Sequence, residues 1–412
     1  MNLLKNLNIS FLDNKRKIFT FLFIISFVAR IIISYFYGDK NLENEWAILV
    51  NNLYNYGTLS MLRFDNLLVP NLWMPPIYAY FVYLHTIIFG FDDNLTNYVI
   101  ASQIIISSLT TIIFYKIILN FFSTKICIYG SVLFSFFPLI VYSASQISSV
   151  TIYLFLLLIF VLLIINLLNQ NSRFHYQQYI LIGFVAGLLI LTRRDFILIY
   201  FFSLIYSFLF FKASIKKLLL ILLVTSITIS PYILRNYVSF DKFIVHSGLG
   251  YNLWKAYNSN AKVDGYHIES DKLKSKINLV PKDIYYRINE DKIYLEEAKN
   301  FIKDNPNKTI ELFFHRLFSL LFIDLQSSQQ NYYNIFHILP NTLISFFSII
   351  GLILYNKKNS KFNYLVLTMM IILLVYSLFA LMPRYKIYIL PFQILLSISF
   401  FDYLIKKLSK KY

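Results

Sequence analysis

Long apolar runs separated by short polar segments dominate this chain. About ten of these runs approach or exceed the roughly 17–25 residues that a helix needs to cross a bilayer. They lie at 18–37, 96–115, 126–143, 150–169, 177–192, 195–211, 217–234, 335–355, 363–382 and 386–405. A helix satisfies all of its backbone hydrogen bonds internally, so each run is expected to be a transmembrane helix. The pattern predicts an all-α, polytopic membrane protein.

The composition excludes a soluble enzyme. Hydrophobic residues make up 58% of the chain and charged residues 14%, against about 25% charged residues in a typical soluble domain. The net charge of +17 could suggest nucleic-acid binding. However, the basic residues collect at the ends of the apolar runs, which indicates membrane topology instead. The single cysteine, Cys127, excludes a disulfide within the chain.

The distribution of charge predicts the topology. With the N-terminus in the cytoplasm, the inner segments and the lysine-rich tail after Tyr403 carry about seventeen Lys or Arg and only two acids, Asp13 and Asp402. The inner loops are then expected near 116–125, 170–176, 212–217 and 356–362. We expect a multi-pass protein of a bacterial plasma membrane, with both termini cytoplasmic.

Two long segments are then expected on the outer side, and long ordered loops usually carry function. The organisation predicted is a catalytic transmembrane module at 1–237 with a first outer loop at 38–94, a large outer loop at 238–334, and C-terminal transmembrane helices at 335–412.

Each outer segment contains an apolar stretch that we expect to be a helix lying in the outer interface of the membrane. The first follows Pro75-Pro76 and ends at Gly90, and the second covers 309–325.

Several basic residues lie at the outer ends of spans, against the usual bias. They are Arg193 and Arg194 beside Asp195, Arg235, and Arg384 near Lys386, while Arg30 lies inside the first span. Such a group indicates a bound anion, and the planar guanidinium suits phosphate. The alternative is that each arginine reaches lipid phosphates or pairs with a neighbouring acid.

The first outer loop supplies carboxylates at Asp39, Glu43 and Glu45, with Trp46 next in the chain. A carboxylate can take the proton from an attacking hydroxyl while arginines stabilise a leaving phosphate. The alternative is a solvated helix start, because acids favour the first turn of a helix.

Several short motifs resemble family 39-type glycosyltransferases of the membrane-embedded GT-C fold, which include protein O-mannosyltransferases and lipid A aminoarabinose transferases. The motifs, in chain order, are Gly38-Asp39, Asn44-Glu45-Trp46, Asn51-Asn52-Leu53, Tyr56 to Ser60, Met74 to Tyr78, Leu191 to Arg194, Pro231 to Tyr237, Gly248 to Trp254, Asn305-Pro306, and Arg384-Tyr385 through Pro391.

The resemblance implies an inverting transferase that takes a sugar from a polyprenyl-phosphate carrier at the outer face, with a lipid, glycan or protein as acceptor. It assigns the general base first to Glu45, then to Asp39, then to Glu43.

The resemblance also implies two sets of binding residues. The lipid phosphate would be held by Arg193, Arg194, Arg235, Arg384 and Tyr385. The loop contacts to substrate would come from Trp46, Pro75, Pro76, Asn236 and Asn252. No residue is assigned to a metal, and a Mg²⁺ or Mn²⁺ requirement stays open.

The chain departs from the family pattern at three places. The acids of the first loop are spread out, Gln146 stands where many relatives carry an acid, and Trp73-Met74 replaces a glutamate-lysine pair before the double proline. The sugar and acceptor therefore stay open.

Two other classes of protein share some of these features. An O-antigen-type polymerase or ligase would also have outer arginines and a large outer loop. A lipid-linked sugar transporter or flippase would account for Arg30 and for the broken segment after Pro75.

Overall fold

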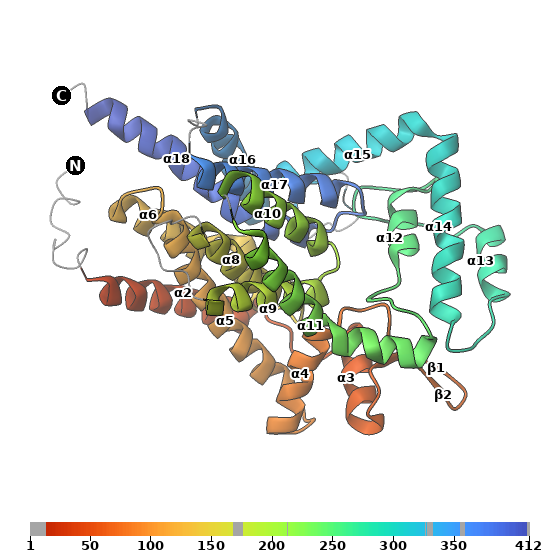
Figure 1. The fold of residues 1–412 in the computed structure, drawn as a ribbon. Coiled ribbons are helices and arrows are strands. Elements are labelled where there is room, and N and C mark those ends of the chain that lie inside the picture. The colour runs from red at the N-terminus through yellow and green to blue at the C-terminus, as the bar shows by residue number, and fades with distance from the viewer. Residues whose placement is uncertain are drawn as a thin grey trace.

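The computed structural model describes residues 14–167, 176–211, 213–325, 327, 333–354 and 359–409. A bundle of helices forms its main body (Figure 1). These helices are α2 (Lys15–Tyr37), α5 (Leu95–Ile118), α6 (Thr124–Phe136), α7 (Pro138–Ser143), α8 (Val150–Leu167), α9 (Tyr176–Thr192), α10 (Phe196–Phe211), α11 (Ile215–Phe240), α16 (Ile335–Leu354), α17 (Ser360–Ser377) and α18 (Leu390–Ser409). Every predicted apolar run coincides with one of them, and the run at 126–143 is broken into α6 and α7 at Pro138. The all-α prediction is confirmed.

The number of membrane crossings stays a prediction. Among the described residues, six helices are long and apolar enough to span a bilayer: α2, α5, α8, α11, α16 and α17. The helices α6, α9 and α10 are apolar but shorter. Most of the predicted inner loop at 170–176 and the first part of the one at 356–362 lie outside the described residues.

Small residues allow α9 and α11 to pack closely in the bundle. A Cβ at Gly183 would lie 2.7 Å from the Ile221 carbonyl oxygen, and one at Gly187 would lie 2.5 Å from Cβ of Thr228. The two glycines are four residues apart and lie on one face of α9, so the backbone of α11 packs directly on that face. Thr225 adds a hydrogen bond of 3.1 Å to the Gly183 carbonyl.

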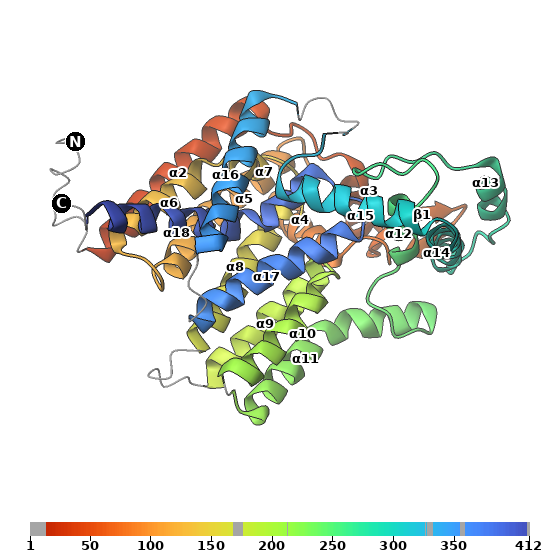
Figure 2. The same ribbon diagram turned by 90° about the horizontal axis from the view of Figure 1, so that it is seen from above.

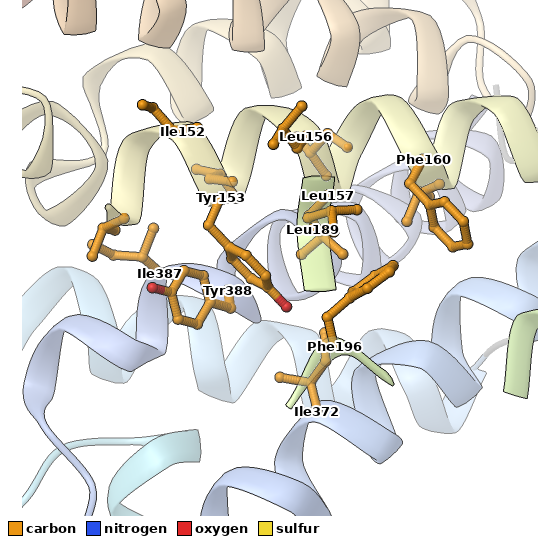
Figure 3. Close-up of a cluster of buried hydrophobic side chains, with 14 of the residues drawn as sticks. Ile152, Tyr153, Leu156, Leu157, Phe160, Leu189, Phe196, Ile372, Ile387 and Tyr388 are labelled. Atoms are coloured by element: carbon orange, nitrogen blue, oxygen red, sulfur yellow. The ribbon is translucent and has the colours of Figure 1, made fainter. Parts of the chain in front are cut away.

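The centre of the bundle is built around α8 (Figure 3). Its Tyr153 and Phe160 are fully buried and pack edge-on against Phe196 of α10, with ring centroids 6.4 and 5.1 Å apart. Tyr153 also packs edge-on against Tyr388, at 4.7 Å. Tyr388 belongs to the short helix η2 (Pro383–Tyr388), so the core extends to the end of the bundle where η2 lies.

Both large outer segments are folded. The first contains α3 (Asn44–Tyr56), β1 (Ser60–Phe64), β2 (Leu67–Pro70) and α4 (Pro76–Phe89). The second contains α12 (Leu249–Ala256), α13 (Asp271–Asn278), α14 (Tyr286–Asp304) and α15 (Pro306–Leu321). The helices expected after Pro75 and within 309–325 are thus present as α4 and α15. The antiparallel β1–β2 hairpin was not predicted.

The two outer segments lie together at one end of the bundle. In both views, the start of α2 and the end of α18 lie at the left, whereas α3, β1, α12, α13 and α14 lie at the right (Figures 1 and 2). The described ends of α2 and α18 and the two long segments thus occupy opposite ends of the bundle, and the side of the membrane that each end faces stays a prediction.

Candidate functional site

Asp39 follows the end of α2 and is fixed on the turn between α7 and α8. Its backbone N–H donates to the Ser145 carbonyl at 3.0 Å, and its Oδ2 accepts a hydrogen bond from the Ile147 backbone N–H at 2.7 Å. The Gln103 side chain on α5 holds the same turn, because its Nε2 donates to the carbonyls of Ala144 (3.2 Å) and Gln146 (2.8 Å). The Asp39 carboxylate therefore has a defined position.

The environment of Asp39 makes its carboxylate more basic than usual. Burial raises the pKa of the Asp39 carboxyl, the Ile147 N–H opposes that rise, and the charge of Glu43 adds to it. Tyr78 on α4 also lies beside Asp39 and donates to Oε1 of Gln103 at 2.8 Å. A half-buried carboxylate with a raised pKa is a suitable general base, because a proton acceptor works best near the operating pH.

The other two candidate bases lie at the start of α3. Glu43 occupies the N-cap position and is exposed, and Glu45 is half-buried in the first turn. Their placement matches the alternative in which acids stabilise a helix N-terminus. Trp46, next in the chain, is buried and packs edge-on against Tyr78 with ring centroids 4.7 Å apart, so it supports the position of Tyr78.

Arg193 lies in a cage of tyrosine rings. Its Nε is 3.2 Å from the Asp195 carboxylate, and its Nη1 donates to the Tyr388 hydroxyl at 3.1 Å. The ring centroids within 6 Å of its Cζ belong to Tyr385 (4.6 Å), Tyr388 (5.0 Å), Tyr376 (5.2 Å) and Tyr153 (5.7 Å). Its side chain is only 17% exposed. Arg193 therefore joins the α9–α10 connection to η2.

Arg194 and Arg235 hold the outer segments in place. Arg194 donates from Nη1 and Nη2 to the Ser247 and Gly248 carbonyls, both at 2.9 Å. Arg235 donates to the Asn71 carbonyl at 2.8 Å and to the Leu59 carbonyl at 3.0 Å. Arg194 thus fixes the backbone just before α12, and Arg235 fixes the backbone shortly before α4.

The remaining four of the five predicted loop contacts have structural roles within the chain. Asn236 donates to the Ile244 carbonyl at 2.7 Å, and Asn252 donates to the Gly248 carbonyl at 2.7 Å. Pro75 and Pro76 start α4, at its N-cap and first helical positions. These residues shape the outer segments, and each of the two asparagines uses its amide nitrogen for this purpose.

Arg384 and Lys255 differ from the other basic residues of this end. Arg384 in η2 is exposed, and Lys255 on α12 lies over the Tyr251 ring at 5.4 Å. Neither forms a hydrogen bond or ion pair with another described residue. Burial lowers the pKa of Lys255 and the charge of Arg384 adds to this effect, whereas the charges of Tyr385 and Asp264 oppose it. Two neighbouring cations without a bound carboxylate form a suitable site for an anion.

Close packing around Gly265 brings Lys255 near Arg384. A Cβ at Gly265 would lie 2.5 Å from Cβ of Ala380 and 3.3 Å from Cε of Lys255. The chain at Gly265 thus fits between α12 and the segment that leads to Arg384. Sequence reasoning missed Lys255, because it belongs to a lysine-rich region in which no spacing sets it apart.

Tyr385 lies between Arg384 of η2 and Arg193 of the α9–α10 connection. Its ring centroid is 4.6 Å from Cζ of Arg193 and 6.0 Å from Cζ of Arg384. Burial alone would raise the pKa of the Tyr385 phenol, but the charges of Arg193 and Arg384 outweigh that effect and leave it lower than usual. The phenol is therefore a stronger hydrogen-bond donor than an ordinary tyrosine.

The carboxylate and the cations occupy the same end of the bundle. The helix η2 packs against both α7 and α8, and the turn that binds Asp39 joins these two helices. The site is therefore assembled from the first outer segment, α12 and η2.

The residues around Asp39 supply few ligands for a divalent metal ion. Within the described ranges, no three side chains of His, Cys, Asp or Glu come together as a ligand group. One oxygen of Asp39 is already bound to the Ile147 N–H, and Gln146 uses its amide nitrogen to donate to the Tyr37 carbonyl at 2.9 Å. No catalytic step is assigned to a metal here.

Comparison with known proteins identifies the architecture. The structure matches the Archaeoglobus fulgidus oligosaccharyltransferase tethered with an acceptor peptide, with a TM-score of 0.58 and 12% identity over 96% of this chain. The oligosaccharyltransferase AglB from Archaeoglobus fulgidus, in complex with an inhibitory peptide and a dolichol-phosphate, matches with a TM-score of 0.54 and 13% identity over 95% of this chain. The chain has the GT-C glycosyltransferase fold.

The similarity to known proteins covers only part of their length or part of this chain. This GT-C chain spans 50% of the length of the archaeal oligosaccharyltransferase. A family profile described as dolichyl-phosphate-mannose-protein mannosyltransferase matches residues 74–234, from the residue before Pro75 to the outer part of α11. No curated protein matches the sequence. The resemblance found in the sequence is thereby confirmed at the level of fold.

Proposed function

We propose that this GT-C protein transfers a sugar from a polyprenyl-phosphate donor to a lipid, glycan or protein acceptor at the outer face of a bacterial plasma membrane. The observation that carries the proposal is the fixed, half-buried Asp39 at the same end of the bundle as the unpaired cations Lys255 and Arg384. The structure of AglB with a dolichol-phosphate supports a lipid-phosphate donor for this fold.

In the proposed reaction, Asp39 acts as the general base. Its Oδ2 is occupied by the Ile147 N–H, which leaves Oδ1 to accept the proton of an acceptor hydroxyl. The acceptor oxygen then bonds to the anomeric carbon as the bond from that carbon to the phosphate oxygen breaks, and polyprenyl phosphate leaves with the electron pair. A single displacement of this kind inverts the configuration at the anomeric carbon.

The cations stabilise the leaving group in this proposal. The phosphate gains negative charge as its bond to the sugar breaks, and positioned cations that face such charge lower the barrier. Lys255 and Arg384 would bind the phosphate directly, with the Tyr385 hydroxyl as a further donor. Arg193, Arg194 and Arg235 would act by holding the framework, since each is already bonded to other parts of the chain.

The proposed site draws on all three parts of the predicted organisation. Asp39 lies in the module at 1–237, Lys255 in the loop at 238–334, and Arg384 in the helices at 335–412. We propose that these parts form one catalytic unit, with its site facing outward and both termini in the cytoplasm.

The first test measures sugar transfer in membranes loaded with labelled polyprenyl-phosphate sugars. Asp39→Asn should lower the transfer rate by about 10²–10⁴-fold, because an amide cannot accept the proton. Glu45→Gln and Glu43→Gln are the matched controls and should stay within a few-fold of wild type. A fully active Asp39→Asn protein would refute the assignment, and loss of activity in Glu45→Gln alone would move the base to Glu45.

The same assay separates the proposal from the other two classes. A wild-type protein that consumes only preassembled lipid-linked oligosaccharides would be a polymerase or ligase. One that moves the donor across the membrane without releasing polyprenyl phosphate would be a transporter.

A further inference from the structure

Arg30 is a buried charge inside the membrane bundle, and the proposed reaction does not use it. Its side chain is fully buried in α2, and no carboxylate of a described residue pairs with it. Its Nε donates to the Ser107 hydroxyl of α5 at 2.6 Å. Its Nη1 donates to the Ser26 carbonyl at 2.9 Å and to the Ser135 carbonyl of α6 at 3.2 Å. A charge is costly in the membrane, so these contacts require an explanation.

The contact to Ser135 lies at the break between α6 and α7. Pro138 has no N–H to donate, and Phe137 adopts an extended conformation, so the last carbonyls of α6 lack their usual helical donors. Arg30 supplies a donor to one of these carbonyls. The guanidinium thereby joins α2 to α6 at the point where the chain changes direction into α7.

A second set of bonds joins α2 to the same stretch of chain. Beyond the end of α2, Asp39 binds the Ser145 carbonyl and the Ile147 N–H, and the Tyr37 carbonyl accepts from Gln146. The short helix α7 is thus held at its start by Arg30 and at its end by the residues around Asp39.

We propose that Arg30 is a positioning residue: its guanidinium fixes the α6–α7 break on α2 and so places the turn whose Ile147 N–H binds Asp39. This inference rests on the proposed function, because it concerns the geometry of the proposed base. Because Arg30 is fully buried, the proposal assigns it no contact with substrate.

A gentle substitution tests the proposal without removing the buried charge. Ser107→Ala deletes the hydroxyl that accepts from Nε of Arg30. Ser108→Ala is its matched control on the same helix, because the Ser108 hydroxyl donates to the Ile104 carbonyl of its own helix. Arg30→Lys and Arg30→Met remove the guanidinium itself. All four proteins are purified and assayed for sugar transfer from a polyprenyl-phosphate sugar across a range of pH.

The expected readout is a change in the pH profile of kcat. The titratable groups beside Asp39 are Glu43 and Tyr78. Asp39 must be ionised to act as base, and the Ile147 N–H favours that ionised form. If the turn shifts, the pKa of Asp39 rises and the acid limb moves to higher pH, by about half a unit or more. We expect this shift in Ser107→Ala and both Arg30 variants, with KM for the donor within about two-fold of wild type.

Other results would overturn the inference. A role in folding alone would lower the amount of active protein and scale the profile without moving its limb. The inference would therefore be contradicted if the acid limb of the kcat profile stayed in place in Ser107→Ala and Arg30→Lys. It would also be contradicted if that limb shifted equally in Ser108→Ala. An inactive wild type would refute the proposed function itself and this inference with it.

Discussion

Basic residues at the outer end of the bundle are used in two different ways. Arg193, Arg194 and Arg235 have their guanidinium nitrogens bonded to carbonyls, a carboxylate or tyrosines of the chain. Lys255 and Arg384 lie close together without such partners. The sequence predicts that these four arginines lie on the outer side, but only the structure separates the residues that bind the protein from those that can bind a ligand.

Removing Lys255 tests this division at the scale of a single residue. Lys255→Met should raise KM for the polyprenyl-phosphate donor by about 10-fold or more, because a hydrogen bond to a charged group is worth roughly 1.5–3 kcal/mol. Lys255→Arg should restore much of the affinity. Lys299→Met, which removes an exposed lysine of α14, is the control and should leave KM unchanged. An unchanged KM in Lys255→Met would exclude this lysine from the phosphate site.

At the scale of elements, the packing of α9 on α11 depends on glycine. Gly187→Leu would place side-chain atoms where Cβ and Cγ2 of Thr228 already lie, so α11 would have to move outward. We expect the free energy of unfolding to fall by about 1–3 kcal/mol, measured by thermal denaturation in detergent. Leu181→Phe is the control: it adds volume on α9 at an exposed position (44%) and should change stability little. Equal stability of both variants would contradict the close packing.

The β1–β2 hairpin is the element that the sequence pattern did not reveal. Its strands have five and four residues, which is too short for alternation to be distinguished from an irregular loop. Two contacts hold it: within the hairpin, the Ser60 hydroxyl donates to the Val69 carbonyl at 2.6 Å, and from far along the chain Arg235 of α11 binds the neighbouring Leu59 carbonyl.

At the scale of the whole molecule, segments far apart in the sequence meet at one end of the bundle (Figure 2). The topology that places this end outside the cell can be tested by labelling, since the only native cysteine, Cys127, is buried. We expect Lys303→Cys, in α14, to react with a membrane-impermeant maleimide in intact cells. Lys125→Cys, at the start of α6, should react only after permeabilisation. The opposite pattern would invert the predicted orientation.

The sequence by itself determined the helical membrane fold, the grouping of two long segments on one side, and the resemblance to GT-C glycosyltransferases. These features follow from local properties, because apolar length sets the spans and basic residues set their direction. Only the tertiary structure decided three features of the site: the Asp39 contact to Ile147, the cage around Arg193 and the approach of Lys255 to Arg384. Each includes at least one pair of residues more than a hundred positions apart, and no local pattern encodes which distant partner a side chain will meet.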